Sequence, residues 1–174
     1  MDQLVALLRG VNVGKSNRIQ NAELVEICET LALQNPRTLL ASGNIIFHAD
    51  VSARSISKQL CTALAARGYD VKVLVLKGDD LRRRLLKCPF STHQGDQVYG
   101  YFCDAPPMTD QGLLTQLRDQ NEDVIGQNRT IWLHTPNGFS QSKVAQSFDK
   151  IVTGTSMTAR NLNTITKLVE MLDS

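Results

Sequence analysis

The first half of the chain alternates short apolar runs, typical of strands, with stretches whose apolar residues recur every three or four positions. Ser42 and Gly43 separate two of these runs, which is the signature of an antiparallel hairpin. The pattern predicts a strand at 3–8, a helix from residue 21, strands at 38–41 and 44–48, a helix over 52–67 capped by Ser52 or Asp50 and ended by Gly68, and a strand at 69–78. This order favours a split βαβ arrangement over a doubly wound parallel sheet.

The second half repeats the order less regularly. It predicts a short helix at 79–88, a strand at 97–104, a helix over 109–120, a hairpin over 122–136 that turns near 127–128, a helix over 139–151, and a last helix with an apolar stripe at Leu162, Ile165, Leu168, Val169 and Leu172. Thr155, Ser156 or Thr158 is the expected cap of the last helix, which puts Arg160 and Asn161 in its first turns. The sequence therefore predicts an α+β fold of two tandem ferredoxin-like (alpha-beta plait) domains, residues 1–77 and 78–174, with antiparallel sheets and a C-terminal helix.

Composition narrows the class of protein. An apolar fraction of 42% and a charged fraction of 21% are typical of a globular chain, and a net charge of +2 is too small to indicate a nucleic-acid partner by itself. No apolar run reaches the roughly 20 residues of a membrane span. The N-terminus has an acidic second residue and no basic lead-in, so we expect no signal peptide and a cytoplasmic location.

Cysteine and histidine spacing predicts no metal site. The four cysteines contain no C-x-x-C pair and the three histidines are scattered; they are Cys28, Cys61, Cys88, Cys103, His48, His93 and His134. We therefore expect four free thiols, no disulfide and no cofactor.

The letters Gly14-Lys15-Ser16 resemble the end of a phosphate-binding P-loop, but the spacing fails. That motif requires a glycine six residues before the lysine, where this chain has Arg9. A P-loop also runs directly into a helix, whereas the better helix start here is Asn21. The segment is a polar loop of another kind, and its arginine and asparagines can hold a carboxylate or phosphate or can simply face solvent.

Two further features have ordinary explanations. Arg82, Arg83 and Arg84 follow an acidic helix start and are expected to form a solvated face rather than a phosphate contact. Tyr99 and Tyr101 alternate along a strand, as the base-stacking aromatics of RNA-recognition domains do. We expect these tyrosines to pack against the other domain instead.

Three blocks of the chain resemble the bacterial family DUF1697. They are "ALLRGVNVGKSNRIQNAEL" near the start, "LASGNIIF" in the first half and "TARNLNT" near the end, in the order of the family. Leu162 stands where the family's closing motif has tryptophan, so this chain has no aromatic ring at that position. The resemblance implies two alpha-beta plaits and brings no established activity.

These observations favour a binding module for a phosphate-bearing ligand, a nucleotide or RNA. A small hydrolase or transferase that holds an anion with arginine and asparagine, and a protein-interaction domain, are the alternatives. The predicted site residues are Arg9, Asn12, Lys15, Asn17, Ser42, Asn44, Arg160, Asn161 and Asn163. The closing motif could instead clamp the last helix as a staple; both interpretations require Arg9 or Asn12 to lie near Arg160 or Asn161.

Overall fold

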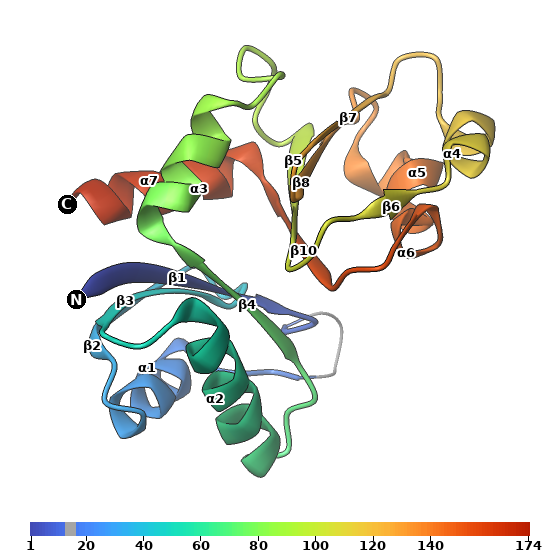
Figure 1. Ribbon diagram of the computed structural model, residues 1–174. Helices are drawn as coiled ribbons and strands as arrows, with labels where there is room; N and C mark the ends of the chain where they lie inside the picture. The colour runs from blue at the N-terminus through green and yellow to red at the C-terminus, as the bar shows by residue number, and fades with distance from the viewer. Residues whose placement is uncertain (13–16) are drawn as a thin grey trace. The chain divides into compact units, whose positions relative to one another are not determined.

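The structure of the protein is a computed structural model that describes residues 1–12 and 17–174. The chain divides into two compact units (Figure 1). Unit 1 consists of Met1–Arg83 and Lys167–Ser174, and unit 2 of Arg84–Thr166. The predicted domain boundary between residues 77 and 78 stays a prediction.

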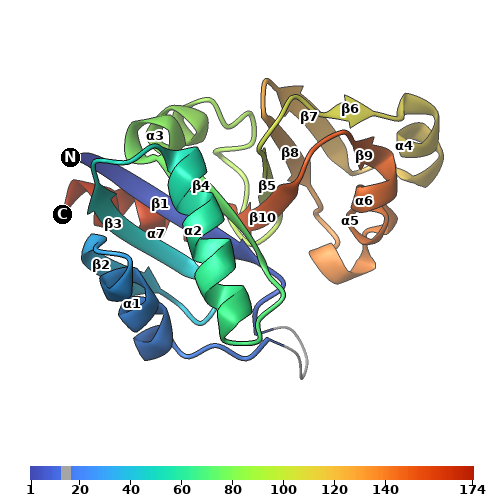
Figure 2. The same cartoon turned by 60° about the horizontal axis from the view of Figure 1, so that its bottom comes forward.

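Unit 1 is a four-stranded antiparallel sheet with two helices on one face (Figure 2). Its elements are β1 (Asp2–Arg9), α1 (Asn21–Thr30), β2 (Gln34–Leu39), β3 (Asn44–Ala49), α2 (Ala53–Ala66) and β4 (Lys72–Lys77). The strand order is β2-β3-β1-β4, so β3 separates β2 from β1. The hairpin is antiparallel, as the sequence predicted, and the side chain of Ser52 rather than Asp50 caps α2.

The core of unit 1 follows the alternation of β1. Leu4, Ala6 and Leu8 are buried against α1 and α2, so the residues between them point to the opposite face of the sheet. Gln3 on that opposite face donates a hydrogen bond to the carbonyl oxygen of Leu172 (3.0 Å). The end of the last helix therefore lies across the sheet from α1 and α2.

The β2–β3 turn depends on Gly43. Its φ of 69° lies in the left-handed region, and a Cβ at this position would be 2.7 Å from Leu8 Cβ and from Val11 Cγ2. The backbone NH of Leu8 donates to the carbonyl of Gly43 (2.8 Å), so the turn is fastened to the end of β1. Only glycine satisfies both the backbone angle and the close approach.

Unit 2 contains a second four-stranded antiparallel sheet, of order β10-β5-β8-β7, and a small β6-β9 pair. Its elements are β5 (Val98–Cys103), β6 (Met108–Thr109), α4 (Gln111–Leu117), β7 (Asp123–Gln127), β8 (Thr130–His134), η1 (Phe139–Gln141), α5 (Lys143–Gln146), α6 (Phe148–Ile151), β9 (Val152–Thr153) and β10 (Met157–Asn161). Helix α3 (Gly78–Leu86) leads into this unit, and α7 (Leu162–Asp173) leads out of it.

Two predicted helices differ from the structure. The single helix expected over 139–151 is three short pieces, because the side chain of Ser142 caps a new helix within it. The last helix begins at Leu162, where Asn161 Oδ1 accepts a hydrogen bond from the backbone NH of Thr164 (2.9 Å). Residues expected in its first turns, Arg160 and Asn161, instead end strand β10.

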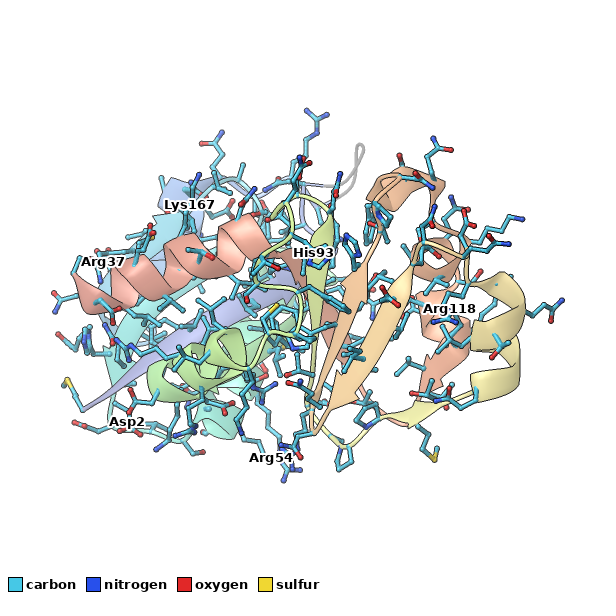
Figure 3. All side chains as sticks on the ribbon, turned by 90° about the horizontal axis from the view of Figure 1, so that it is seen from above. Asp2, Arg37, Arg54, His93, Arg118 and Lys167 are labelled. Atoms are coloured by element: carbon cyan, nitrogen blue, oxygen red, sulfur yellow. The ribbon has the colours of Figure 1, made fainter. Side chains whose placement is uncertain are left out.

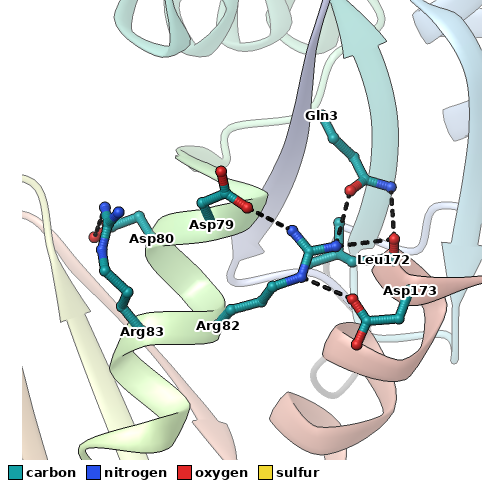
Figure 4. Close-up of polar contacts among 7 residues, drawn as sticks. All are labelled: Gln3, Asp79, Asp80, Arg82, Arg83, Leu172 and Asp173. Carbon is teal, nitrogen blue, oxygen red and sulfur yellow. Dashed lines mark hydrogen bonds and ion pairs between the residues drawn. The ribbon is translucent and has the colours of Figure 1, made fainter.

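The predicted solvated face of α3 is wrong for two of its three arginines. Arg82 bonds Gln3, Asp79, Asp173 and the carbonyl of Leu172, all within unit 1 (Figure 4). Arg84 donates to the carbonyl of Arg129 and to Thr130 Oγ1 in unit 2. Only Arg83 is largely exposed, at 66%.

A second arginine holds the C-terminus of the chain. Arg37, on β2, donates to the carbonyl of Met171 (2.6 Å) and to Ser174 Oγ (3.0 Å) (Figure 3). The last turn of α7 has carbonyls without helical partners, which guanidinium groups satisfy well. Together with Arg82, this arginine makes residues 167–174 part of unit 1.

The fold is thus a mixed α+β structure with antiparallel sheets and a C-terminal helix, as the sequence predicted. Among the described residues, no helix has the length and apolar character needed to cross a membrane.

Candidate functional site

Two cations lie side by side where the chain leaves β1. Arg9 and Lys72 are directly opposite each other at the end of the β1–β4 pair, on the face of the sheet away from α1 and α2. Like charges in this position destabilise a sheet. Lys72 is exposed, and in the described part of the chain no ion pair involves it. The pair therefore concentrates positive charge at this end of the sheet.

Asn12 builds the loop after β1. Its φ is 54°, and its side-chain amide donates to the carbonyls of Ile19 (3.2 Å) and Ala41. Its Oδ1 accepts from the NH of Ile19 (3.0 Å), and its own NH donates to the carbonyl of Asn17 (3.0 Å). Asn12 thus fastens both ends of the loop and joins it to the β2–β3 turn.

Asn17 ties the other side of the loop. It also has a positive φ, 49°, and its amide donates to the carbonyls of Gly10 (3.1 Å) and Asp70 (3.2 Å). Asp70 precedes β4, so this contact holds Asn17 beside the start of β4. The predicted site residue Lys15 lies outside the described residues.

Ser42 and Asn44 lie at the same end of the sheet as Arg9. The sequence left open whether this turn lies at that end or the opposite one, and the pairing of Leu7 with Asn44 decides it. Asn44 is buried, and its amide donates to the carbonyl of Leu39 (3.0 Å) and to Ser42 Oγ (2.7 Å). The structure therefore brings together five predicted site residues in unit 1, of which the asparagines shape the backbone.

The closing motif has contacts within unit 2. Arg160 donates to Thr158 Oγ1 and to the carbonyl of Ala159 (both 2.8 Å), and burial lowers its pKa to about 10. The guanidinium remains charged at neutral pH. Asn163 lies so close to Gly95 that a Cβ there would be 2.1 Å from Asn163 Oδ1. With Asn161 as the cap of α7, each residue of the motif has a structural role in its own unit, and its meeting with Arg9 or Asn12 stays a prediction.

Lys72 was missed by sequence reasoning. Its strand was predicted, but only the strand register shows that the lysine lies opposite Arg9. The one signal for it was the predicted strand order, which places the fourth strand beside the first.

The histidines of unit 2 form a cluster that the sequence did not predict. The rings of His93 and His134 are 4.2 Å apart, and that of Phe90 lies 5.6 Å from His134. Burial of His134 lowers its pKa, the charge of His93 lowers it further, and Asp123 opposes both effects. Nδ1 of His134 is buried, and no described residue offers it a hydrogen-bond partner.

The tyrosines of β5 have aromatic partners within their own unit, whereas the sequence predicted that they pack against the other domain. Tyr101 stacks on Phe148, with ring centroids 3.5 Å apart, and Tyr99 lies against Phe139 at 4.2 Å. Both phenylalanines belong to unit 2. These contacts cover the ring faces that an RNA base would need.

The cysteines are poorly suited to nucleophilic chemistry. All four are free thiols. Burial raises the pKa of Cys28 to about 12, and burial also raises the pKa of Cys88 and Cys103. The reactive thiolate is therefore disfavoured at these three positions.

Comparison with known proteins gives a family and a fold. The sequence profile of the family described as "Protein of unknown function (DUF1697)" matches residues 1–132. The chain is similar in structure to the conserved bacterial protein SP0830 from Streptococcus pneumoniae, with a TM-score of 0.77 and 23% identity over 100% of this chain and 99% of that one. No curated protein matches the chain.

Proposed function

The chain belongs to the DUF1697 family, whose description assigns no function, and we propose from its geometry that it binds an anionic, phosphate-bearing ligand. The site is the end of the unit 1 sheet where Arg9 and Lys72 lie, bordered by the β1–α1 loop and the β2–β3 turn. We call this region the cationic end. Its ligand is a nucleotide or a phosphate group of RNA.

The observation that carries this proposal is the register of Arg9 opposite Lys72. Two cations on neighbouring strands repel each other, and a multiply charged anion between them replaces the repulsion with two attractions. Arginine offers a planar fork that suits phosphate oxygens, and lysine adds a compact point charge. The pair thus has the chemistry of a phosphate clamp.

The asparagine-built loop supports the proposal through preorganisation. Asn12 and Asn17 hold left-handed backbone conformations and bind carbonyls of neighbouring loops. Backbone that is already held at residues 12 and 17 loses little conformational entropy when a ligand arrives. The asparagines therefore act as positioning residues, and the charges act on the ligand.

We also infer that each unit is a ferredoxin-like plait. In unit 1 the order β2-β3-β1-β4, with helices after the first and third strands, supports this. In unit 2 the order β7-β8-β5-β10 repeats it, with α4 after the first strand and α5 and α6 after the third. In such a sheet the first strand is central, so the loop after it lies between neighbouring strand ends.

The test is titration of the full chain with sodium tripolyphosphate by isothermal calorimetry. Lys72→Gln and Arg9→Gln should each weaken binding about tenfold, since each removes a charge-assisted contact. Lys58→Gln is the matched control, because Lys58 is an exposed lysine of unit 1 on α2, and it should change affinity less than about twofold. A wild type that does not bind, or an equal loss in the control, would contradict the proposal.

A further inference from the structure

Strand β7 is an exposed edge of the unit 2 sheet. It pairs with β8 on one side and, in the described part of the chain, with no strand on the other. Three of its five residues are exposed, and Ile125 is one of the exposed large apolar residues of the chain, at 39%. A Cβ added at Gly126 would meet no described atom within 4 Å. An edge of this kind offers its backbone groups to another strand.

The backbone groups of Val124 and Gly126 point to this open side. The NH of Cys103 on β5 donates to the carbonyl of Arg129 (2.9 Å), so the odd-numbered residues of β8 bond toward β5. The even-numbered residues of β8 therefore bond toward β7, where their partners are the odd-numbered residues. The NH and carbonyl groups of Val124 and Gly126 face away from β8, and no described residue bonds them.

The other edge strands of the two sheets are protected against pairing. Pro36 and a shift in register interrupt β2, and β4 has an exposed lysine at each end, Lys72 and Lys77. In β10 none of the five residues is exposed. Proline, bulges and lysine are the devices with which proteins prevent edges from associating. Residues 123–127 contain no proline, no lysine and no register shift, so the edge of β7 is available.

We infer that β7 pairs with β7 of a second copy of this chain, antiparallel and centred on Ile125. In this register Val124 of one copy lies opposite Gly126 of the other, and all of the outward NH and carbonyl groups find partners. Ile125 contacts its own copy at the two-fold axis, which removes apolar surface from water. Asp123 lies opposite Gln127, whose side-chain amide donates to a carboxylate. The inference is independent of the proposed function.

A second copy is favoured over an unrelated strand because this register is self-complementary. Asp123 is the one charged residue of the strand, and antiparallel pairing keeps the two aspartates at opposite ends, whereas parallel pairing would place them side by side. A shift by two residues in either direction would set Ile125 against Asp123 or Gln127 and leave outward groups unpaired. A five-residue edge buries less than the roughly 1,200 Å² of stable complexes, so we expect weak association, with a Kd on the order of 10–100 µM.

The first test is sedimentation velocity of the full chain between about 1 µM and 1 mM, where wild type should pass from monomer to dimer. Ile125→Lys sets two like charges against each other at the axis and should weaken association at least about tenfold. Met108→Lys is the matched control, because Met108 is an exposed apolar residue of unit 2 at 63%. It should change the Kd less than about twofold, and equal melting temperatures show that both variants are folded.

The second test fixes the register by crosslinking. At the axis the two Cα atoms of residue 125 are about 4.5 Å apart, within the range of a disulfide, so Ile125→Cys should give a covalent dimer under mild oxidation. The two copies of residue 127 are about 13 Å apart along the strands, so Gln127→Cys should give no more covalent dimer than wild type.

The remaining outcomes contradict the inference. A wild type that stays monomeric throughout the concentration range, an equal loss in the two lysine variants, or a dimer that survives Ile125→Lys overturns β7 as the interface. A covalent dimer from Gln127→Cys rather than from Ile125→Cys overturns the pairing centred on Ile125.

Discussion

The two units share a strand order and differ in the residues at the ends of their first strands. In unit 1 the last residues of the β1–β4 pair are Arg9 and Lys72; in unit 2 the equivalent pair, from β5 and β10, is Cys103 and Met157. The residue after β5 is Asp104, whose carboxylate accepts hydrogen bonds from Thr155 Oγ1 (2.8 Å) and the NH of Ser156 (2.9 Å). One topology thus carries a cationic end in unit 1 and an acidic turn in unit 2.

The connections differ as well. Unit 1 joins its strands through helices of 10 and 14 residues, whereas unit 2 uses a helix of 7 residues and then pieces of 3, 4 and 4. Where the helices are short, the stacked pair of Tyr101 and Phe148 fills the core. Strand pairing therefore preserves this architecture, while the helices and the loops beyond the first strand vary and carry the difference in chemistry.

The largest expected effect breaks the β2–β3 turn of unit 1. Gly43→Ala combines a left-handed φ with two 2.7 Å contacts and should lower the free energy of unfolding by about 3 kcal/mol. Gly10→Ala is the matched control, because its φ is 81° but no atom of residues 1–12 and 17–174 lies within 4 Å of the added Cβ; it should cost about 1 kcal/mol. Equal losses in urea denaturation would show that the close approach to Leu8 is unimportant.

The next effect concerns the arginines of α3. Arg82→Gln removes contacts to Gln3, Leu172 and two aspartates, and we expect a loss of about 2 kcal/mol. Arg83→Gln should change stability by less than about 0.5 kcal/mol, because its one ion pair is exposed. Chemical denaturation measures the free energy of unfolding of both variants. Equal losses in the two would mean that the contacts of Arg82 add no stability, as expected for a solvated side chain.

The free energy of unfolding should depend on pH through a histidine of unit 2. Since the pKa of His134 is lowered in the folded state from 6.5, the unfolded state binds a proton first as pH falls. Stability is therefore fully present above about pH 6.5 and is lost as pH falls from there toward the lowered folded pKa. His134→Gln should flatten this slope, and His93→Gln should flatten it partly. An unchanged slope in His134→Gln between about pH 7.5 and 5 would exclude this cause.

The smallest expected effect sharpens the charge comparison. Asp70 is the exposed acidic residue two positions before Lys72, and only its backbone carbonyl is used by Asn17. Asp70→Asn should therefore raise the affinity for tripolyphosphate about twofold at low salt, and less at high salt. Calorimetry detects this change, and a weakened affinity would place the anion away from β4.

Sequence patterning predicted strands β1, β3 and β4 of unit 1, both hairpins and the apolar stripe of α7, because these depend on local periodicity. Strand β2, expected at 38–41, lies instead at Gln34–Leu39, and residues 40 and 41 belong to the turn. Sequence patterning failed where contacts between residues far apart in the chain determine the structure. The role of Arg82 comes from Gln3 and Asp173, 79 and 91 residues away. Strand β10 was assigned to a helix start because its polar letters suit a cap, and only pairing with β5 makes them a strand. In the candidate site, the polar loop residues were named from the sequence, but Lys72 could be identified only from the observed pairing of β1 with β4.

The most direct test of the cationic end is to map backbone amide shifts by NMR while tripolyphosphate is added. We predict shifts grouped at residues 9–12, 17–19, 40–44 and 70–73 of unit 1, with residues 103–105 and 155–158 of unit 2 unchanged. These segments have the same topological position and opposite charge, so the two sets are internal controls for each other. Shifts grouped in the unit 2 set, or none in the unit 1 set at saturating ligand, would contradict the cationic end as the binding site.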